Sequence, residues 1–291
     1  MIYAATEGPC TLIVEPDDDP VDPRIDCDPF GHMVCWHRRY SLGDGHHYAT
    51  PEDFLRDLYR KSIRDGGKRL VQFLKSGDAR GAKLIYNRSS REWELHFCYY
   101  LRTVPGKSEP SWELEQSAPK EQLNNSGWFF EDMLDALTID DLKQLLSEQK
   151  DILILPLYLY DHSGLSISTG SFVGRAHHAE WDSGQVGYIY AEHDDILNNF
   201  GEITPDTIRQ AKECLEGEVE AYDAFLRGDC WGYRAFMYGH EMDACRGFLG
   251  DIDDVKPDIA SSLVDGWNQL VGKLAPRYQS AKEYLYDAAV A

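Results

Sequence analysis

The longest apolar run near the middle of the chain predicts a buried strand, and we expect the rest of the fold to be arranged around it. Residues 152–160 form a nine-residue run of Ile, Leu and Tyr. This length is typical of a strand buried on both faces and is too short to cross a bilayer. Pro156 interrupts the run. Because proline cannot donate to a strand ladder, it indicates a sheet edge or a bulge there.

Alternating polarity after this run predicts two further strands. Residues 161–164 are small or polar and predict a turn, and residues 165–169 then alternate between apolar and polar side chains. Residues 185–190 place Val and Tyr on one side of another strand, where Gly187 would let a neighbouring chain approach closely. The intervening loop, 170–184, is polar and rich in His.

Similar patterns divide the rest of the chain into short elements. Thr50 followed by Pro51 and two acids is typical of a helix start, which predicts a helix over 51–65. Apolar residues at helical spacing predict a long helix over 205–227. We expect further strands over 10–15, 33–37, 82–87, 92–101, 230–238 and 243–249. We expect further helices over 68–75, 128–137, 138–149, 194–200, 258–272 and 278–289. Residues 103–126 are polar, contain three prolines and predict a long loop.

These elements predict an α+β fold, in which helices pack on a mixed, largely antiparallel sheet. The strands that we expect to share this sheet lie near residues 32–37, 152–160, 186–191 and 231–238. Residues 1–65 and 138–291 would form the core domain. Residues 66–137 would form an inserted subdomain.

The charge of the chain limits the kinds of partner it can bind. The 291 residues carry a formal net charge of −21, with 43% hydrophobic and 12% aromatic residues, which is typical of a globular protein. A surface that binds nucleic acid needs clustered Lys and Arg, so we expect no direct contact with nucleic acid. The charge suits a basic partner instead. The alternative is that it only keeps the protein soluble.

Cysteine usage and the N-terminal sequence predict where the protein acts. The seven cysteines include no CxxC pair and are odd in number, so we expect reduced thiols in the cytoplasm. The first ten residues have neither a basic region nor a long apolar core, so we expect no signal peptide. We also expect no membrane-spanning segment.

Polar side chains at strand ends are the candidates for catalysis. The candidate residues are Asp161, His162, Ser163, Asp182, Ser183 and His37. Asp161, His162 and Ser163 cannot form a triad by themselves, because neighbouring side chains on a strand do not face each other. His162 could instead act as a general base near Asp182 or His37. Ser163 or Ser183 would then be a nucleophile or a substrate contact.

The same residues have two other interpretations. Asp161, His162 and Asp182 could hold a divalent metal ion. No other cofactor is expected, since the chain contains no phosphate loop, dinucleotide fingerprint or nucleophile elbow. The structural alternative is that the aspartates cap turns, His162 bonds a backbone carbonyl and Ser163 forms the turn.

One face of the predicted helix at 205–227 is a candidate binding surface. Its acidic residues are Glu213, Glu216, Glu220 and Asp223. Acids three or four residues apart on a helix lie about 5–6 Å apart, and phosphates follow one DNA strand at about 3.4 Å. The row could therefore imitate a nucleic acid, although an ordinary solvated helix face has the same pattern. Trp181 and Arg38 are further candidate contacts for a partner.

Five segments of the chain carry a resemblance to a known family. They are, in order, MVCWHRRYSLGDGHHYATPEDFL, LPLYLYDHSG, WDSGQVGYIY, EVEAYDAFLRGDCWGY and DACRGFLG. Together they resemble a family of proteins encoded by bacteriophages, prophages and conjugative elements, over residues 30–60 and 150–250. The chain departs from the family at Arg246, where Trp is expected, and in a longer, His-rich loop at 170–180. The resemblance implies a context, a mobile element inside a host cell, rather than an activity.

In that context we expect an acidic protein in the host cytoplasm that binds and inhibits a host protein. The target would have a basic surface, as a nuclease or a restriction or CRISPR-type defence component has, and nucleic-acid mimicry is one means of binding it. The first alternative is a hydrolase, dependent on a metal or on His and Asp, at the ends of the central strands. The second is an accessory protein-interaction module. A homo-oligomer is also compatible with the sequence.

Overall fold

The computed structural model describes residues 1–104, 107–264 and 266–290. Helices and antiparallel sheets confirm the predicted α+β class. The chain forms two compact units. The first contains Met1–Cys35, Leu155–Ile189 and Lys212–Ala291, and the second contains Trp36–Ile154 and Tyr190–Ala211. In the described part of the chain, no helix has both the length and the apolar character needed to cross a membrane.

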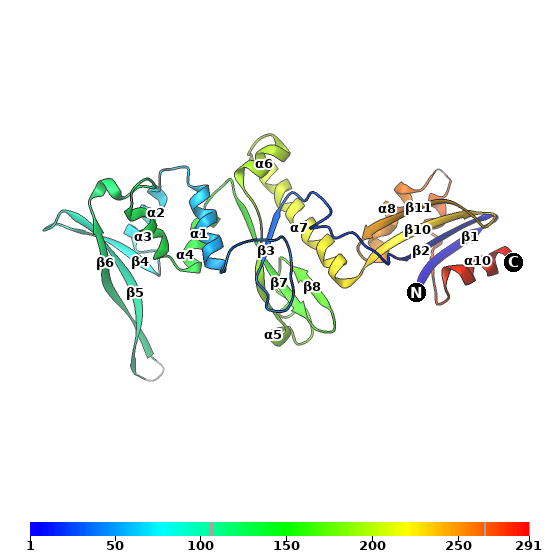
Figure 1. Ribbon diagram of the computed structural model, residues 1–291, viewed down its shortest axis with the longest axis horizontal. Helices are drawn as coiled ribbons and strands as arrows, with labels where there is room; N and C mark the ends of the chain where they lie inside the picture. Colours follow the sequence, from blue (N-terminus) through cyan, green and yellow to red (C-terminus); the bar gives the residue numbers. More distant parts are fainter. Residues whose placement is uncertain (105–106, 265, 291) are drawn as a thin grey trace. The chain divides into compact units, whose positions relative to one another are not determined.

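A five-stranded antiparallel sheet forms one layer of the first unit, in the order β11-β10-β2-β1-β12 (Figure 1). Its strands are β1 (Ile2–Glu7), β2 (Cys10–Pro16), β10 (Cys230–Met237), β11 (His240–Leu249) and β12 (Ala275–Arg277). Helices α8 (Ile252–Ser262) and α9 (Asn268–Val271) cover one face through a core that includes Tyr233 and Trp267. Helix α10 (Ala281–Val290) packs on the other face beside Phe236.

This sheet corrects two predictions. The strand at 231–238 does not share a sheet with the central strands, because β10 pairs with β2 and β11 instead. The helix predicted over 258–272 is two helices, α8 and α9, and residue 265 of that range lies outside the described residues. Strands β1 and β12 were not predicted, since each is short and neither has a clear alternation of its own.

The central strands form a four-stranded sheet in the order β3-β9-β7-β8. They are β3 (His32–Cys35), β7 (Leu153–Asp161), β8 (Leu165–Ser168) and β9 (Ser183–Ala191), and the short helix α5 (Ala179–Asp182) leads into β9. The strand of this sheet that is buried over most of its length is β9, from Val186 to Ala191. The prediction of such burial for β7 is therefore wrong, since most of β7 is only half-buried.

Two local predictions for these strands are confirmed. A Cβ atom on Gly187 would lie 2.0 Å from the carbonyl oxygen of Val34, so only glycine allows β3 to approach this closely. The β7–β8 ladder begins at Tyr158. Pro156 therefore lies where β7 is not paired with β8, which suits a residue that has no N–H to donate.

The second unit contains helices and a three-stranded antiparallel sheet, β4-β5-β6. The strands are β4 (Ala82–Asn87), β5 (Glu92–Val104) and β6 (Lys107–Ala118). The helices are α1 (Pro51–Ser62), α2 (Lys68–Ser76), α3 (Phe129–Asp135), α4 (Ile139–Ser147) and α6 (His193–Phe200), with a 3-10 turn at Lys120–Gln122. Helix α7 (Pro205–Arg227) begins in this unit and continues into the first.

Strand β6 contradicts the loop predicted over 103–126, of which residues 105–106 lie outside the described residues. It pairs with β5 along its length, for example Trp93 with Ala118 and Cys98 with Trp112. As an outer strand it needs no apolar face of its own and tolerates Pro110. The units also run across the domain boundaries predicted at 65/66 and 137/138, because residues 66–137 share the second unit with residues on both sides.

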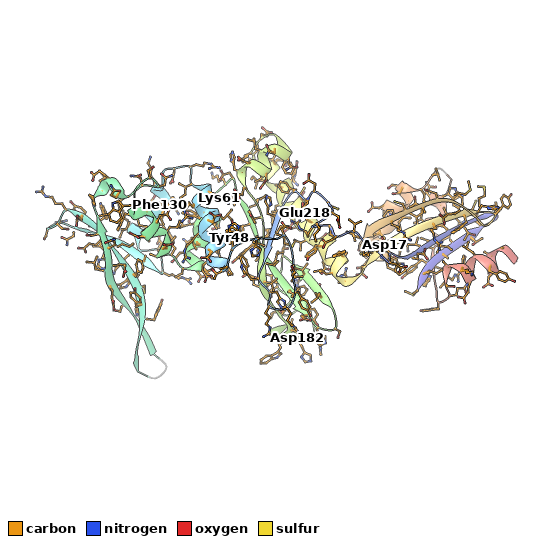
Figure 2. All side chains as sticks on the ribbon, viewed as in Figure 1. Asp17, Tyr48, Lys61, Phe130, Asp182 and Glu218 are labelled. Atoms are coloured by element: carbon orange, nitrogen blue, oxygen red, sulfur yellow. The ribbon has the colours of Figure 1, made fainter. Side chains whose placement is uncertain are left out.

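A half-buried carboxylate in the second unit, that of Asp57, ties the loop after β3 to α1. Tyr48 donates a hydrogen bond of 2.7 Å from its hydroxyl to Asp57, and Lys61 forms a 2.8 Å ion pair with the same oxygen (Figure 2). Burial alone would raise the pKa of Asp57, but the bonds from Lys61 and Tyr48 lower it below the usual value. Burial, followed by the bond to Asp57, raises the pKa of Tyr48.

A second carboxylate, Glu218 of α7, holds the acidic loop between β2 and β3, residues 17–31 of the first unit. Glu218 accepts from the Arg24 guanidinium at 2.9 Å, and from the backbone N–H groups of Phe30 at 2.5 Å and Gly31 at 3.1 Å (Figure 2). Arg24 also donates to the carbonyl of Gly31 at 2.7 Å and is only 7% exposed. The single base of this loop is therefore paired internally and does not offset charge at the surface.

We expect Glu218→Ala to lower the free energy of unfolding by about 3–5 kcal/mol, because it removes the carboxylate that pairs with the buried Arg24 guanidinium and accepts from two backbone N–H groups. Chemical denaturation followed by circular dichroism measures this. Glu220→Ala, an exposed position on the same helix, is the control and should change stability by no more than about 0.5 kcal/mol. Equal effects of the two substitutions would contradict the assignment.

Candidate functional site

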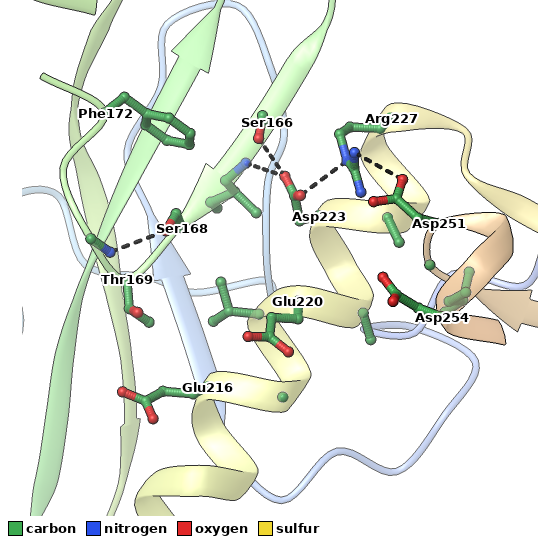
Figure 3. A pocket seen from close by; sticks show the side chains of 18 of the residues that line it. Ser166, Ser168, Thr169, Phe172, Glu216, Glu220, Asp223, Arg227, Asp251 and Asp254 are labelled. Carbon is green, nitrogen blue, oxygen red and sulfur yellow. Dashed lines mark hydrogen bonds and ion pairs between the residues drawn. The ribbon is translucent and has the colours of Figure 1, made fainter. Parts of the chain in front are cut away.

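An acidic groove of about 790 Å³ lies on the first unit, between β8 with its following loop, the C-terminal part of α7 and the segment that enters α8 (Figure 3). Its charged lining residues are Glu216, Glu220, Asp223, Asp251, Asp254, Arg175 and Arg227. Ile167, Phe172 and Val219 contribute apolar wall. The lining thus contains five carboxylates and two guanidinium groups, which makes the groove a candidate site for a cation.

Asp223 has a structural role within the groove. Its carboxylate accepts from the Ser166 hydroxyl and the Ile167 backbone N–H, both at 2.7 Å (Figure 3). Because β8 is the outer strand of its sheet, the Ile167 N–H faces no further strand, and the Asp223 side chain takes the place of one. Asp223 is therefore not part of an open acidic row.

Arg227 connects the end of α7 to the groups around it. Its guanidinium lies 3.0 Å from Asp223, 3.0 Å from Asp229 and 3.6 Å from Asp251. A cation at the C-terminal end of a helix also interacts favourably with the helix dipole. Arg227 is therefore already paired with acids of the chain itself, whereas the Arg175 guanidinium donates to the backbone carbonyls of Gly170 and Ser171.

The remaining acids differ in what they contact. Glu216 forms a 3.4 Å ion pair with Lys212, and Glu213 is exposed on the same helix without lining the groove. Within the part of the chain that the structure describes, the carboxylates of Glu220 and Asp254 form neither an ion pair nor a hydrogen bond. These two carboxylates give the groove its unbalanced negative charge.

The structure brings two of the candidate catalytic residues together at the turn that connects β7 and β8. His162 follows β7, and its Nδ1 lies 2.8 Å from a carboxylate oxygen of Asp182, the last residue of α5 (Asp182 is labelled in Figure 2). The side chains are 42% and 33% exposed, respectively. This pair orients the imidazole ring, and the described residues form no hydrogen bond to its Nε2.

The other catalytic candidates have local roles. Ser163 occupies the turn after His162 with φ +64°, and Asp161 is the last residue of β7, paired in register with Leu165. Ser183 donates from its hydroxyl to the carbonyl of Ala179 at 2.6 Å. His37 belongs to the second unit, where its Nδ1 accepts from the backbone N–H of Tyr40 at 3.2 Å. Among the described residues, Asp182 is the candidate that hydrogen-bonds His162.

Sequence reasoning did not single out the rings around His162. Tyr160 stacks on His162 with centroids 5.8 Å apart, and Phe172 stacks on Tyr160 at 5.5 Å. His177 and His178 lie 6.3 and 6.2 Å from His162 between ring centroids. The high His content of loop 170–184 was the signal in the sequence for the His177 and His178 contacts. The sequence does not predict where this loop folds back, so it does not place these rings beside His162.

The two other candidate contacts for a partner, Trp181 and Arg38, are both exposed. Trp181 is 85% exposed on α5, and Arg38 is exposed in the second unit. Across residues 1–104, 107–264 and 266–290, no three His, Cys, Asp or Glu side chains gather so as to hold a metal ion in their present positions. Metal binding by Asp161, His162 and Asp182 stays a prediction.

Comparisons with protein-family models, curated proteins and solved structures found no match to this chain. Function is therefore inferred from the geometry of the groove and of the His162–Asp182 pair.

Asp223→Ala should lower the free energy of unfolding by about 1–3 kcal/mol, because it leaves the Ile167 N–H and the Ser166 hydroxyl without their acceptor. Asp223→Asn keeps an acceptor oxygen and should cost less. Hydrogen exchange at the Ile167 amide provides a local readout and should become faster in Asp223→Ala. Unchanged exchange at Ile167 would show that the carboxylate does not close the β8 edge.

Proposed function

We propose that this protein binds a cationic segment of another protein in the acidic groove, and that it inhibits that protein by doing so. The observation that carries the proposal is the pair of carboxylates, Glu220 and Asp254, which line the groove without a partner among the described residues. A Lys or Arg side chain from a partner would supply the missing positive charge. A carboxylate pair of this kind favours a cation over a nucleic acid.

The shape and lining of the groove suit such a side chain. Its volume of about 790 Å³ falls within the range of about 300–1,000 Å³ that is usual for ligand pockets. Val219 and Phe172 offer apolar wall for the aliphatic stem of Lys or Arg. The hydroxyls of Ser168 and Thr169 also line the groove and can accept hydrogen bonds from a guanidinium group.

The whole-chain charge and the resemblance to mobile-element proteins suggest the kind of partner. A net charge of −21 would steer the protein towards a basic surface and speed association at low ionic strength. In the cytoplasm of a host cell, that surface would belong to a nuclease or to a restriction or CRISPR-type defence component. A more specific version of the proposal is that Glu213, Glu216 and Glu220 mimic the phosphates of a nucleic acid. Asp223 does not extend this row, because it is bonded to Ser166 and Ile167.

The double substitution Glu220→Lys and Asp254→Lys should weaken partner binding at least tenfold, because it replaces attraction with repulsion at the groove. Tagged wild-type and variant proteins are purified from host cells at low and high salt, and bound proteins are identified by mass spectrometry. A partner that is lost from the variant is then purified. Its affinity for both proteins is measured by calorimetry at several salt concentrations, where the wild-type affinity should fall as salt rises.

The matched control is Glu113→Lys with Glu115→Lys, two exposed acids of β6 in the second unit. It changes the net charge by the same amount and should leave partner affinity within about twofold at 0.15 M salt, where distant charges are screened. If both double variants lose affinity equally, binding depends on overall charge and the groove is not the site.

The 2.8 Å bond between His162 and Asp182 supports a second candidate function, a hydrolase in which His162 is the general base. The carboxylate would hold the imidazole in one tautomer and stabilise its protonated form. The nucleophile would be a water molecule or the hydroxyl of Ser163, since the hydroxyl of Ser183 is already bonded to Ala179.

If this second candidate is right, His162→Ala should reduce hydrolysis by about 10²–10⁴-fold and leave the melting temperature nearly unchanged. A panel of chromogenic esters and phosphoesters is the assay. His193→Ala is a matched control, because His193 makes a similar 3.0 Å contact with Asp151 in the second unit. Equal loss in the two variants, or no hydrolysis by the wild type, would exclude the assignment.

A further inference from the structure

Three imidazoles from two separate segments gather at the turn that connects β7 and β8. His162 follows β7, and His177 and His178 come from the loop before α5. The ring centroids of His177 and His178 are 3.8 Å apart, and each lies about 6 Å from that of His162, at 6.3 and 6.2 Å. We infer that this histidine cluster, His162, His177 and His178, is a binding site for a divalent transition-metal ion of the Zn²⁺ type.

The backbone that carries the cluster is fixed on both sides. The Tyr160 hydroxyl donates to the carbonyl of His177 at 2.8 Å. The carbonyl of His178 accepts from the N–H groups of Trp181 and Asp182 at 2.9 and 3.0 Å. His178 itself has φ +56°, a left-handed conformation that is uncommon for a residue other than glycine. This strained position directs attention to function, because such strain concentrates at sites that bind ligands.

Asp182 gives His162 the arrangement that metal-binding histidines usually have. In most such sites one ring nitrogen binds the metal and the other donates to a carboxylate or carbonyl, which fixes the tautomer. The Nδ1 of His162 lies 2.8 Å from Asp182, so the proton is held at Nδ1. The lone pair of Nε2 is then available for a metal ion. In this arrangement Asp182 supports the ligand and is not a ligand itself.

The distances show how much adjustment the site requires. Zn–N bonds of about 2.0–2.1 Å in a tetrahedral site place the centroids of two ligand imidazoles about 5 Å apart. The observed separations of 6.2, 6.3 and 3.8 Å differ from this by about 1 Å each. As the described residues stand, no metal-holding group of three is formed. Because the side chains of His177 and His178 are exposed, rotation about their own side-chain bonds can supply the change.

The chemistry of the donors selects the ion. Neutral imidazoles suit Zn²⁺, Cu²⁺, Ni²⁺ and Co²⁺, whereas Mg²⁺ and Ca²⁺ prefer oxygen ligands. Three histidines leave a fourth position for water, as in catalytic rather than structural zinc sites. The inference concerns binding of the ion alone, so it does not depend on partner binding in the groove or on hydrolysis by His162.

The test is titration of the metal-free full-length protein with ZnCl₂ by isothermal calorimetry, at a pH where imidazole is neutral. We expect one ion per chain. Co²⁺ should give the visible absorption of a tetrahedral nitrogen site. Asp182→Asn should weaken Zn²⁺ binding by about 10–100-fold, the effect that loss of an outer-shell carboxylate usually has. His177→Ala and His178→Ala should each weaken it at least tenfold, and both should retain the circular dichroism spectrum of the wild type.

The control is His193→Ala, which removes a histidine that contacts Asp151 in the second unit and should leave the affinity for Zn²⁺ unchanged. The inference is overturned if the wild-type protein shows no saturable Zn²⁺ binding. It is equally overturned if the triple variant His162→Ala, His177→Ala, His178→Ala binds Zn²⁺ as tightly as the wild type. In that case the ion binds elsewhere on the chain.

Discussion

The arrangement of the first unit depends on the hydrogen bonds and the ion pair that the Glu218 carboxylate accepts. Three donors converge on it: the Arg24 guanidinium and the backbone N–H groups of Phe30 and Gly31. Gly31 approaches α7 so closely that a Cβ atom there would lie 2.2 Å from a methyl group of Leu215. The bonds to Glu218 therefore determine where the acidic loop ends and where β3 begins, and β3 in turn lies against Gly187 of β9.

A second carboxylate on α7 continues this arrangement on another side of the helix. Five residues along an α-helix correspond to a rotation of about 140°, so Asp223 faces away from Glu218. It bonds Ser166 and Ile167 of β8. Through these two side chains α7 holds the N-terminal loop on one side and the open edge of the four-stranded sheet on another. The acidic groove exists because this second contact brings β8 and its following loop beside the helix.

The sequence could predict α7 itself but not the separate roles of its acids. Residues 205–227 were assigned from the spacing of apolar side chains, and the helix has these bounds. Glu218 and Asp223 bond other segments of the chain, whereas Glu220, between them in the sequence, faces the groove without a partner among the described residues. Local patterns do not distinguish these cases, because the deciding contacts come from residues 56 to 194 positions away.

The same limit explains the errors in the sheets. The thirteen-residue strand β5 and its hairpin partner β6 form a long antiparallel ladder with register shifts at Leu95/His96 and Arg102/Val104. The sequence of β6 is nevertheless typical of a loop, because an outer, solvated strand carries no apolar stripe. The burial expected of β7 belongs to β9. The order β3-β9-β7-β8 depends on pairing between distant segments, which local patterns do not show. Proximity of His162 and Asp182 was predicted from strand ends, whereas the Tyr160 and Phe172 rings were not.

The β7–β8 hairpin explains why both candidate sites occur on the first unit. Its ladder is short, from Tyr158 paired with Ser168 to Asp161 paired with Leu165, so the chain leaves the sheet soon after each strand. The residues after β8 line the groove, and those before α5 return to His162. Phe172 belongs to both regions, as a wall of the groove and as the ring that stacks on Tyr160. A single hairpin, closed at its edge by Asp223, thus contributes to both the acidic groove and the histidine cluster.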